Sequence, residues 1–61
     1  MAQITCKELS ALSDLLALEE NLVMKYKTYA SETQDSVLRN RYESIAQRHQ
    51  RHYDDLYANL K

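Results

Sequence analysis

The sequence contains no glycine, proline, phenylalanine or tryptophan. Glycine and proline supply most tight hairpin turns, bulges and sharp loops, so their absence argues against an all-β or an α/β fold. Hydrophobic residues make up 44% of the chain and charged residues 28%, a balance typical of a folded helical protein rather than a disordered one. The 61 residues allow a single all-α domain, 1–61. A chain of this size buries only about 60% of the surface that its unfolded form exposes.

An excess of charge of one sign is also missing, since the formal net charge is −1. The arginines of the second half have acidic neighbours. Arg39–Glu43 and Arg51–Asp55 have the i, i+4 spacing of ion pairs on a solvated helix face. A nucleic-acid-binding domain would instead concentrate basic residues on one face. We therefore expect neither a nucleic-acid partner nor attraction to acidic membranes.

The single cysteine, Cys6, excludes an internal disulfide and a multi-cysteine zinc site. The first residues, MAQITCKELSALSD, lack the basic start and the apolar run of a signal peptide. No stretch approaches the roughly 20 apolar residues of a membrane span. These features predict a protein that is cytoplasmic when synthesised and has no membrane partner.

The pattern of apolar residues predicts two helices. Thr5 and Glu8 have the spacing of a capping box, in which each side chain bonds to the backbone N–H of the other residue. Apolar residues then recur at intervals of three and four, as on the buried stripe of a helix. The first stripe comprises Leu9, Leu12, Leu15, Leu16, Leu22, Val23, Tyr26, Tyr29 and Ala30. The second comprises Leu38, Tyr42, Ile45, His49, His52, Leu56 and Leu60.

A polar segment, SETQDS at 31–36, separates the stripes and is expected to form the turn, with Asp35 as N-cap of the second helix. We predict helices at about 6–32 and 36–59, joined by a turn at about 33–35. A short loop makes such helices antiparallel neighbours. Two helices alone leave the outer edges of their stripes in water. We therefore expect two copies to associate as a homodimeric four-helix bundle.

The buried side of this hairpin is predicted to contain a polar layer. Glu19 lies at helical spacing from apolar residues on both sides of it and therefore faces the core. In an antiparallel hairpin that turns near 33–34, Glu19 and His49 lie at one level, and His52 lies one turn away. The hydroxyl of Tyr26 is expected to donate to this layer, because Tyr26 follows Glu19 by seven residues on the same face.

The cluster of Glu19, His49 and His52 has two interpretations at this point. In the first, a buried Glu–His hydrogen bond fixes the register and the pairing of the helices. In the second, the carboxylate and the imidazoles bind a metal ion such as iron or zinc. Imidazole and carboxylate suit such ions, and histidines at i, i+3 share a helix face. Glu20 lies on the flank of the stripe and is expected to be solvated.

The segments EENLVMKYKTYAS and LRNRYESIAQRHQRHYDDL resemble the helical hairpin of ferritin-like and rubrerythrin-like proteins. Glu19 and Tyr26 match the Glu and the Tyr seven residues later in the first helix of that hairpin. His52 matches the His of the Glu-x-x-His motif in its second helix, with His49 in place of the Glu. The resemblance implies half of a ferritin-like four-helix bundle. A dimer would bring only two core carboxylates, where a di-iron site uses four.

A closer resemblance is to short bacterial proteins related to the spore-coat F family, which are single ferritin-like hairpins. Their KYxxYA segment and their xxHQxHYxxLxxxL pattern are matched here by Lys25–Ala30 and His49–Leu60. The resemblance implies a spore-coat-like structural or assembly protein that is not an enzyme and needs no cofactor. Its partners would be a second copy and other coat proteins, and its location would be the spore coat.

Three functions therefore remain open from the sequence. The first is the structural protein that the resemblance implies. The second is a metal-binding ferritin-like protein that uses Glu19, His49 and His52 from two protomers. The third is an adaptor whose exposed groove accepts a partner helix, and such an adaptor would be a folded monomer.

Overall fold

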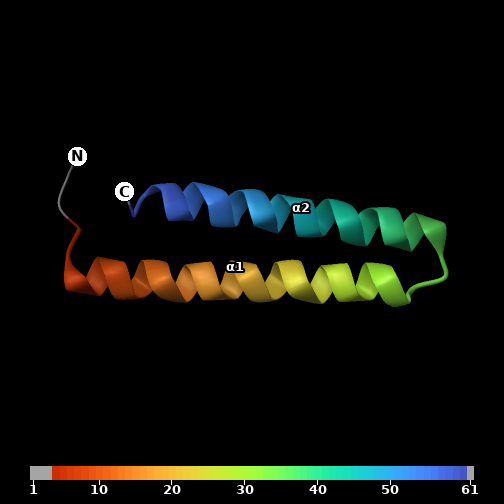
Figure 1. The fold of residues 1–61 in the computed structure, drawn as a ribbon, viewed down its shortest axis with the longest axis horizontal. Helices are drawn as coiled ribbons and strands as arrows, with labels where there is room; N and C mark the ends of the chain where they lie inside the picture. Colours follow the sequence, from red (N-terminus) through yellow and green to blue (C-terminus); the bar gives the residue numbers. More distant parts are fainter. Residues whose placement is uncertain (1–3, 61) are drawn as a thin grey trace.

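The structure, a computed structural model, describes residues 4–60, which form two α-helices. Helix α1 spans Cys6–Glu32 and helix α2 spans Ser36–Ala58. The helices lie side by side and antiparallel, so the start of α1 and the end of α2 lie at the same end of the hairpin (Figure 1). The predicted all-helical hairpin is confirmed. Helix α2 ends one residue before the predicted position, because the N–H of Asn59 donates to both Leu56 O and Tyr57 O and tightens the last turn.

The start of α1 is capped largely as predicted. Thr5 has an extended backbone, and its Oγ1 accepts a hydrogen bond from the backbone N–H of Glu8 at 3.1 Å. The return bond of the expected capping box differs. The Glu8 carboxylate accepts from the Thr5 hydroxyl at 2.9 Å, and not from the Thr5 backbone N–H.

Arg39 of α2 closes the end of α1, whereas the sequence predicted that Arg39 would form an ion pair with Glu43. Helix α1 has no basic residue in its last turn. The guanidinium of Arg39 supplies the positive charge, since its Nη2 donates to Thr33 O at 2.9 Å and its Nε donates to Ala30 O at 3.4 Å. Within residues 4–60, the expected ion pairs of Arg39 with Glu43 and of Arg51 with Asp55 are not formed.

Asp35 caps the start of α2, and we expect Asp35→Ala to lower the free energy of unfolding by about 1 kcal/mol. Its Oδ1 accepts from the N–H groups of Val37 at 2.8 Å and Leu38 at 3.1 Å, and alanine would leave both donors without this partner. Urea unfolding followed by circular dichroism at one fixed protein concentration measures the effect. Gln34→Ala, at an exposed neighbouring position, is the control. Equal losses in the two variants would contradict the capping role.

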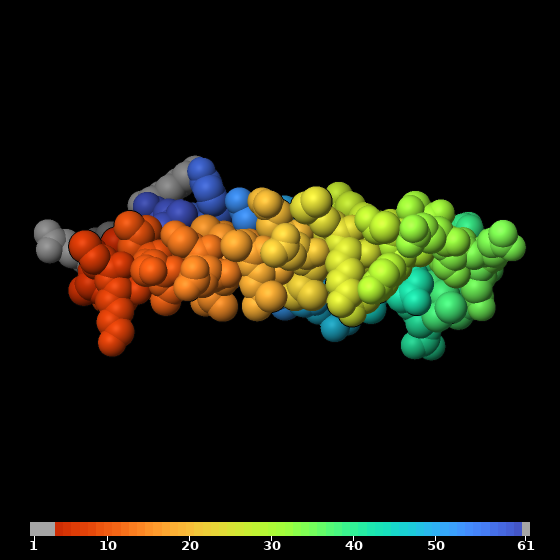
Figure 2. Space-filling view, turned by 90° about the horizontal axis from the view of Figure 1, so that it is seen from below, coloured from red at the N-terminus to blue at the C-terminus, as the bar shows by residue number. Residues whose placement is uncertain are grey.

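The hairpin is a single layer of helices with a small core. Its Cα atoms extend over 47 × 17 × 10 Å. Seen from the side of α1, the molecule is a narrow rod in which α1 forms most of the visible surface (Figure 2). Among residues 4–60, only Val23, Ala30 and Ala46 are buried. Ala46 was missing from the predicted stripe, and the two alanines allow the helices to approach closely at their positions.

Leucines and tyrosines gather on one side of the hairpin, which we call the apolar face. It comprises Leu15, Leu18, Leu22 and Tyr29 of α1 with Leu38 and Ile45 of α2, all of them exposed or half-buried. Seven-residue spacing keeps Leu15, Leu22 and Tyr29 on one stripe of α1. The same spacing keeps Leu38, Ile45 and His52 on one stripe of α2. The contacts of Tyr29 with Tyr42 and of His52 with Glu19 place both stripes on the same side.

The opposite side of the hairpin is polar. A groove between the helices there is lined by Lys27, Glu43, Ala46, Gln47 and Gln50. The two sides therefore differ in chemistry around this groove, in the half of the hairpin nearer the turn. Stable domains bury an apolar side against a second layer of secondary structure. A single hairpin with one apolar side has no second layer of its own.

Candidate functional site

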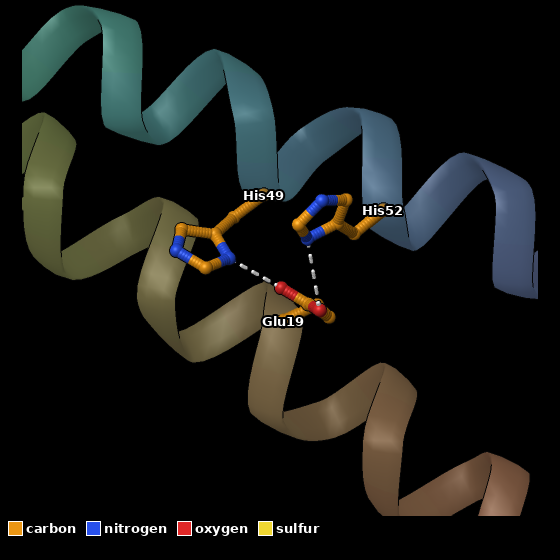
Figure 3. Close-up of side chains that lie close together, drawn as sticks. All are labelled: Glu19, His49 and His52. Atoms are coloured by element: carbon orange, nitrogen blue, oxygen red, sulfur yellow. Dashed lines mark hydrogen bonds and ion pairs between the residues drawn. The ribbon is translucent and has the colours of Figure 1, made fainter.

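The candidate site is a cluster of three side chains at mid-length of the hairpin, between α1 and α2. Glu19 projects from α1, and His49 and His52 project from successive turns of α2 toward it (Figure 3). The antiparallel register brings them together. Glu19 meets His49, and the rings of Tyr26 and Tyr42 lie 6.0 Å apart one level closer to the turn. This is the register predicted from a turn near residues 33–34.

One carboxylate serves both imidazoles. Glu19 Oε1 lies 2.6 Å from Nδ1 of His49, and Oε2 lies 3.4 Å from Nδ1 of His52. A carboxylate without a proton only accepts hydrogen bonds, so the shorter contact is a hydrogen bond in the tautomer of His49 that has its proton on Nδ1. A contact of 2.6 Å is slightly shorter than the range of about 2.7–2.9 Å for charge-assisted N–H···O hydrogen bonds.

The three side chains differ in burial. The side chain of Glu19 is 16% exposed and that of His49 is 23% exposed, whereas that of His52 is 48% exposed. Glu19 and His49 therefore belong to the interface between the helices. His52 lies at the edge of the apolar face, where it contacts Glu19 and the ring of His49 and is otherwise half exposed. The sequence placed all three in the interior, and a single hairpin does not enclose His52.

Aromatic rings hold His49 in place from the side of the turn. The ring of Tyr26 stacks on the imidazole of His49, with centroids 6.4 Å apart and an angle of 13° between the planes. Tyr26 also contacts Tyr42 and Tyr29, with Tyr29 edge-on at 5.7 Å. His52 meets His49 edge-on at 5.4 Å. Tyr26 thus orients the imidazole by stacking its ring, whereas the sequence predicted that its hydroxyl would donate to the polar layer.

The donor atoms of the cluster are close enough to share a metal ion. One nitrogen from each of His49 and His52 and one oxygen of Glu19 all lie within 4.8 Å of one another. Ligands at the zinc–nitrogen distance of about 2.1 Å in a tetrahedral site are separated by about 3.4 Å. The contact between Glu19 and His52 has this length already. His49 contacts the other oxygen, Oε1, at 2.6 Å, so a shared site needs side-chain rotations that bring the three donor atoms, now within 4.8 Å of one another, to similar separations.

The residues next to Glu19 in the sequence lie on different faces of the hairpin. Glu20 is exposed, as expected of a solvated residue, and lines a groove between the helices with Met24 and Lys27, on the opposite face of the hairpin from the apolar face. Leu18 was absent from the predicted stripe although it is an exposed apolar residue of the apolar face. The sequence signal that could have placed Leu18 on this face is its distance of seven residues from Ala11. Residues seven apart lie on the same side of a helix, so Ala11 and Leu18 form a second apolar row beside the predicted stripe of α1.

Neither helix, over residues 4–60, has the combination of length and apolar character that a membrane crossing requires. The chain matches no family model, and searches of curated proteins and of solved structures find no match either.

Proposed function

We propose that the chain is a structural assembly module that acts as a homodimer, in which two hairpins associate through their apolar faces and complete a four-helix bundle. The observation that carries this proposal is the exposure of Leu15, Leu18, Tyr29 and Leu38 on one side of a single-layer hairpin. Burying a leucine or similar side chain contributes about 1.5–3 kcal/mol. A second layer of the same kind therefore supplies stabilisation that the small core of one hairpin lacks.

The spacing of the apolar residues favours a second copy over another partner. Leu15, Leu22 and Tyr29 follow one another at intervals of seven residues, as do Leu38, Ile45 and His52. Seven-residue repeats are the pattern of helices that pack at about 20° in left-handed bundles. A two-fold axis places the same stripes against each other, so one sequence pattern satisfies both sides of the interface.

The cluster of Glu19, His49 and His52 fits this interface. His52 and the edge of Glu19 lie on the side that the second hairpin would cover. In such a dimer the paired groups would specify how the hairpins align, as single polar positions do in coiled coils, because a misaligned pairing would leave a charged group buried without a partner.

A non-enzymatic, coat-like role for this module rests on the sequence resemblance to spore-coat F-type hairpins at Lys25–Ala30 and His49–Leu60. Coat proteins would then be further partners and the spore coat its location. The distribution of a fluorescently tagged chain in a sporulating bacterium tests this part. Enrichment at the forespore surface is the expected result, and an even distribution through the cytoplasm would count against it.

Sedimentation velocity at micromolar concentration tests the homodimer. We expect a species of about 14 kDa, twice the 7.2 kDa of one chain. A folded species with the mass of one chain would contradict the homodimer and favour an adaptor that offers its apolar face to a different helix. A chelator in the buffer keeps the result independent of any bound metal.

A second candidate function is metal binding by Glu19, His49 and His52, with the clusters of two protomers brought to the same interface and iron or zinc as the ion. The observation that favours it is the convergence of one carboxylate and two imidazoles within 4.8 Å. Surface carboxylates often gather without a ligand, but two imidazole nitrogens aimed at one carboxylate form a mixed donor set that transition metals prefer.

A further inference from the structure

We infer that Glu19, His49 and His52 of each chain form a complete, mononuclear site for a divalent transition-metal ion of the zinc type. This inference rests on the second candidate function and specifies it in three respects. One chain supplies all three protein ligands, each site holds one ion, and the ion is of the borderline class that nitrogen and oxygen donors select.

Geometry assigns the site to a single chain. Both Nδ1 atoms already point at the two oxygens of the same carboxylate, at 2.6 Å and 3.4 Å (Figure 3). An ion placed among these atoms replaces two direct contacts with three bonds to the metal. Three protein ligands suffice for a zinc site that leaves a fourth position to water or another external ligand.

The number of carboxylates argues for one ion. Sites that hold two ions in helical bundles use four carboxylates, several of which bridge the ions. A dimer of this chain contributes two copies of Glu19, and each copy is directed at the imidazoles of its own chain. Bridging between two ions would leave His49 or His52 of each chain without its present partner. A separate ion in each chain keeps all three groups together.

Orientation and exposure of the ligands also fit. Stacking on Tyr26 fixes the ring of His49, which lowers the entropy that the ring loses on binding. The half-exposed ring of His52 faces the apolar side and provides the entry path for the ion. The donor set of two imidazoles and one carboxylate binds first-row ions in the Irving–Williams order, in which zinc exceeds iron(II) and manganese.

Calorimetric titration of zinc chloride into the untagged full chain tests the inference, with the protein purified without a metal column and freed of chelator. We expect one zinc ion per chain. His52→Gln is expected to weaken binding by at least about 100-fold, since loss of even an outer partner of a ligand costs 10- to 100-fold. His52 is half exposed, so this variant keeps the packing of the hairpin.

Glu19→Gln should weaken zinc binding as strongly. The neighbouring Glu20→Gln is the matched control and should leave binding unchanged, because Glu20 is outside the cluster and lines the groove on the other face of the hairpin. Cobalt(II) provides a second readout, since its visible spectrum reports the ligands directly. A cobalt spectrum that His52→Gln leaves unaltered, one zinc ion per two chains, or an absence of zinc uptake would each overturn the inference.

The same samples separate this inference from the homodimer. A dimer that persists in chelator but takes up no zinc would overturn the metal site alone. A monomer that binds one zinc ion through the three ligands would support the site and overturn the homodimer.

Discussion

Leu15→Lys is expected to weaken self-association of the chain by about 10- to 100-fold. Leu15 is 45% exposed in the single hairpin and is the first residue of the stripe of α1 on the apolar face. Full burial of a leucine contributes about 1.5–3 kcal/mol, so burying the exposed part of Leu15 contributes roughly half of that in each chain, and a symmetric dimer loses about 1.4–2.7 kcal/mol. Each 1.4 kcal/mol is a factor of ten in the dissociation constant. Sedimentation equilibrium over a range of concentrations measures the change.

Met24→Lys is the matched control, because Met24 is 60% exposed and lines a groove on the polar side of the hairpin with Lys27 and Gln50. It introduces the same charge into the same helix and should leave the dissociation constant within about twofold of the parent value. If both variants associate as the parent chain does, the apolar face is not the interface. If both weaken association equally, net charge rather than position determines the effect.

Replacing Glu19 and His49 together is expected to cost less free energy of unfolding than the two single replacements added together. Glu19→Leu leaves both imidazoles without their acceptor, and His49→Leu leaves a half-buried carboxylate with only the longer contact to His52. An unsatisfied group of this kind costs about 1–3 kcal/mol. In the double variant neither member of the pair remains, and leucines fit the apolar surroundings. We expect a coupling energy of about 1–2 kcal/mol.

Urea unfolding of the parent chain, the two single variants and the double variant measures this coupling. All four must be compared at one protein concentration and in chelator, because association and metal binding both raise the apparent stability. Glu20→Gln, outside the cluster, should behave as the parent chain does. Strict additivity of the two single changes would mean that Glu19 and His49 do not interact in solution.

Local signals in the sequence predicted the two helices well. Thr5 and Asp35 are side chains that bond to N–H groups two or three residues later, and such bonds depend on neighbours in sequence alone. The lapse of the apolar rhythm after Ala30 located the turn, because a helix without tertiary contacts loses the support of packing there. Once the turn is placed near residues 33–34, the number of residues on each side of it predicts that Glu19 lies opposite His49.

Features that depend on packing were harder to predict. Arg39 turns away from Glu43 to close the end of α1, where carbonyl oxygens without a partner inside the helix and the partial negative charge of the helix end accept its N–H groups. Ala46 is buried although its small side chain contributes little to a stripe. The half-exposure of His52 depends on what covers the apolar face, and periodicity identifies that face without identifying its partner.

Contacts between copies across the apolar face are measured most directly by an isotope-filtered nuclear Overhauser experiment on an equal mixture of labelled and unlabelled chains. Only contacts between different chains give signals in this experiment. Association through the apolar face predicts cross-chain signals from the methyl groups of Leu15, Leu22 and Ile45, and none from Met24. Cross-chain signals confined to Met24, or no cross-chain signals from a folded chain at millimolar concentration, would contradict the homodimer.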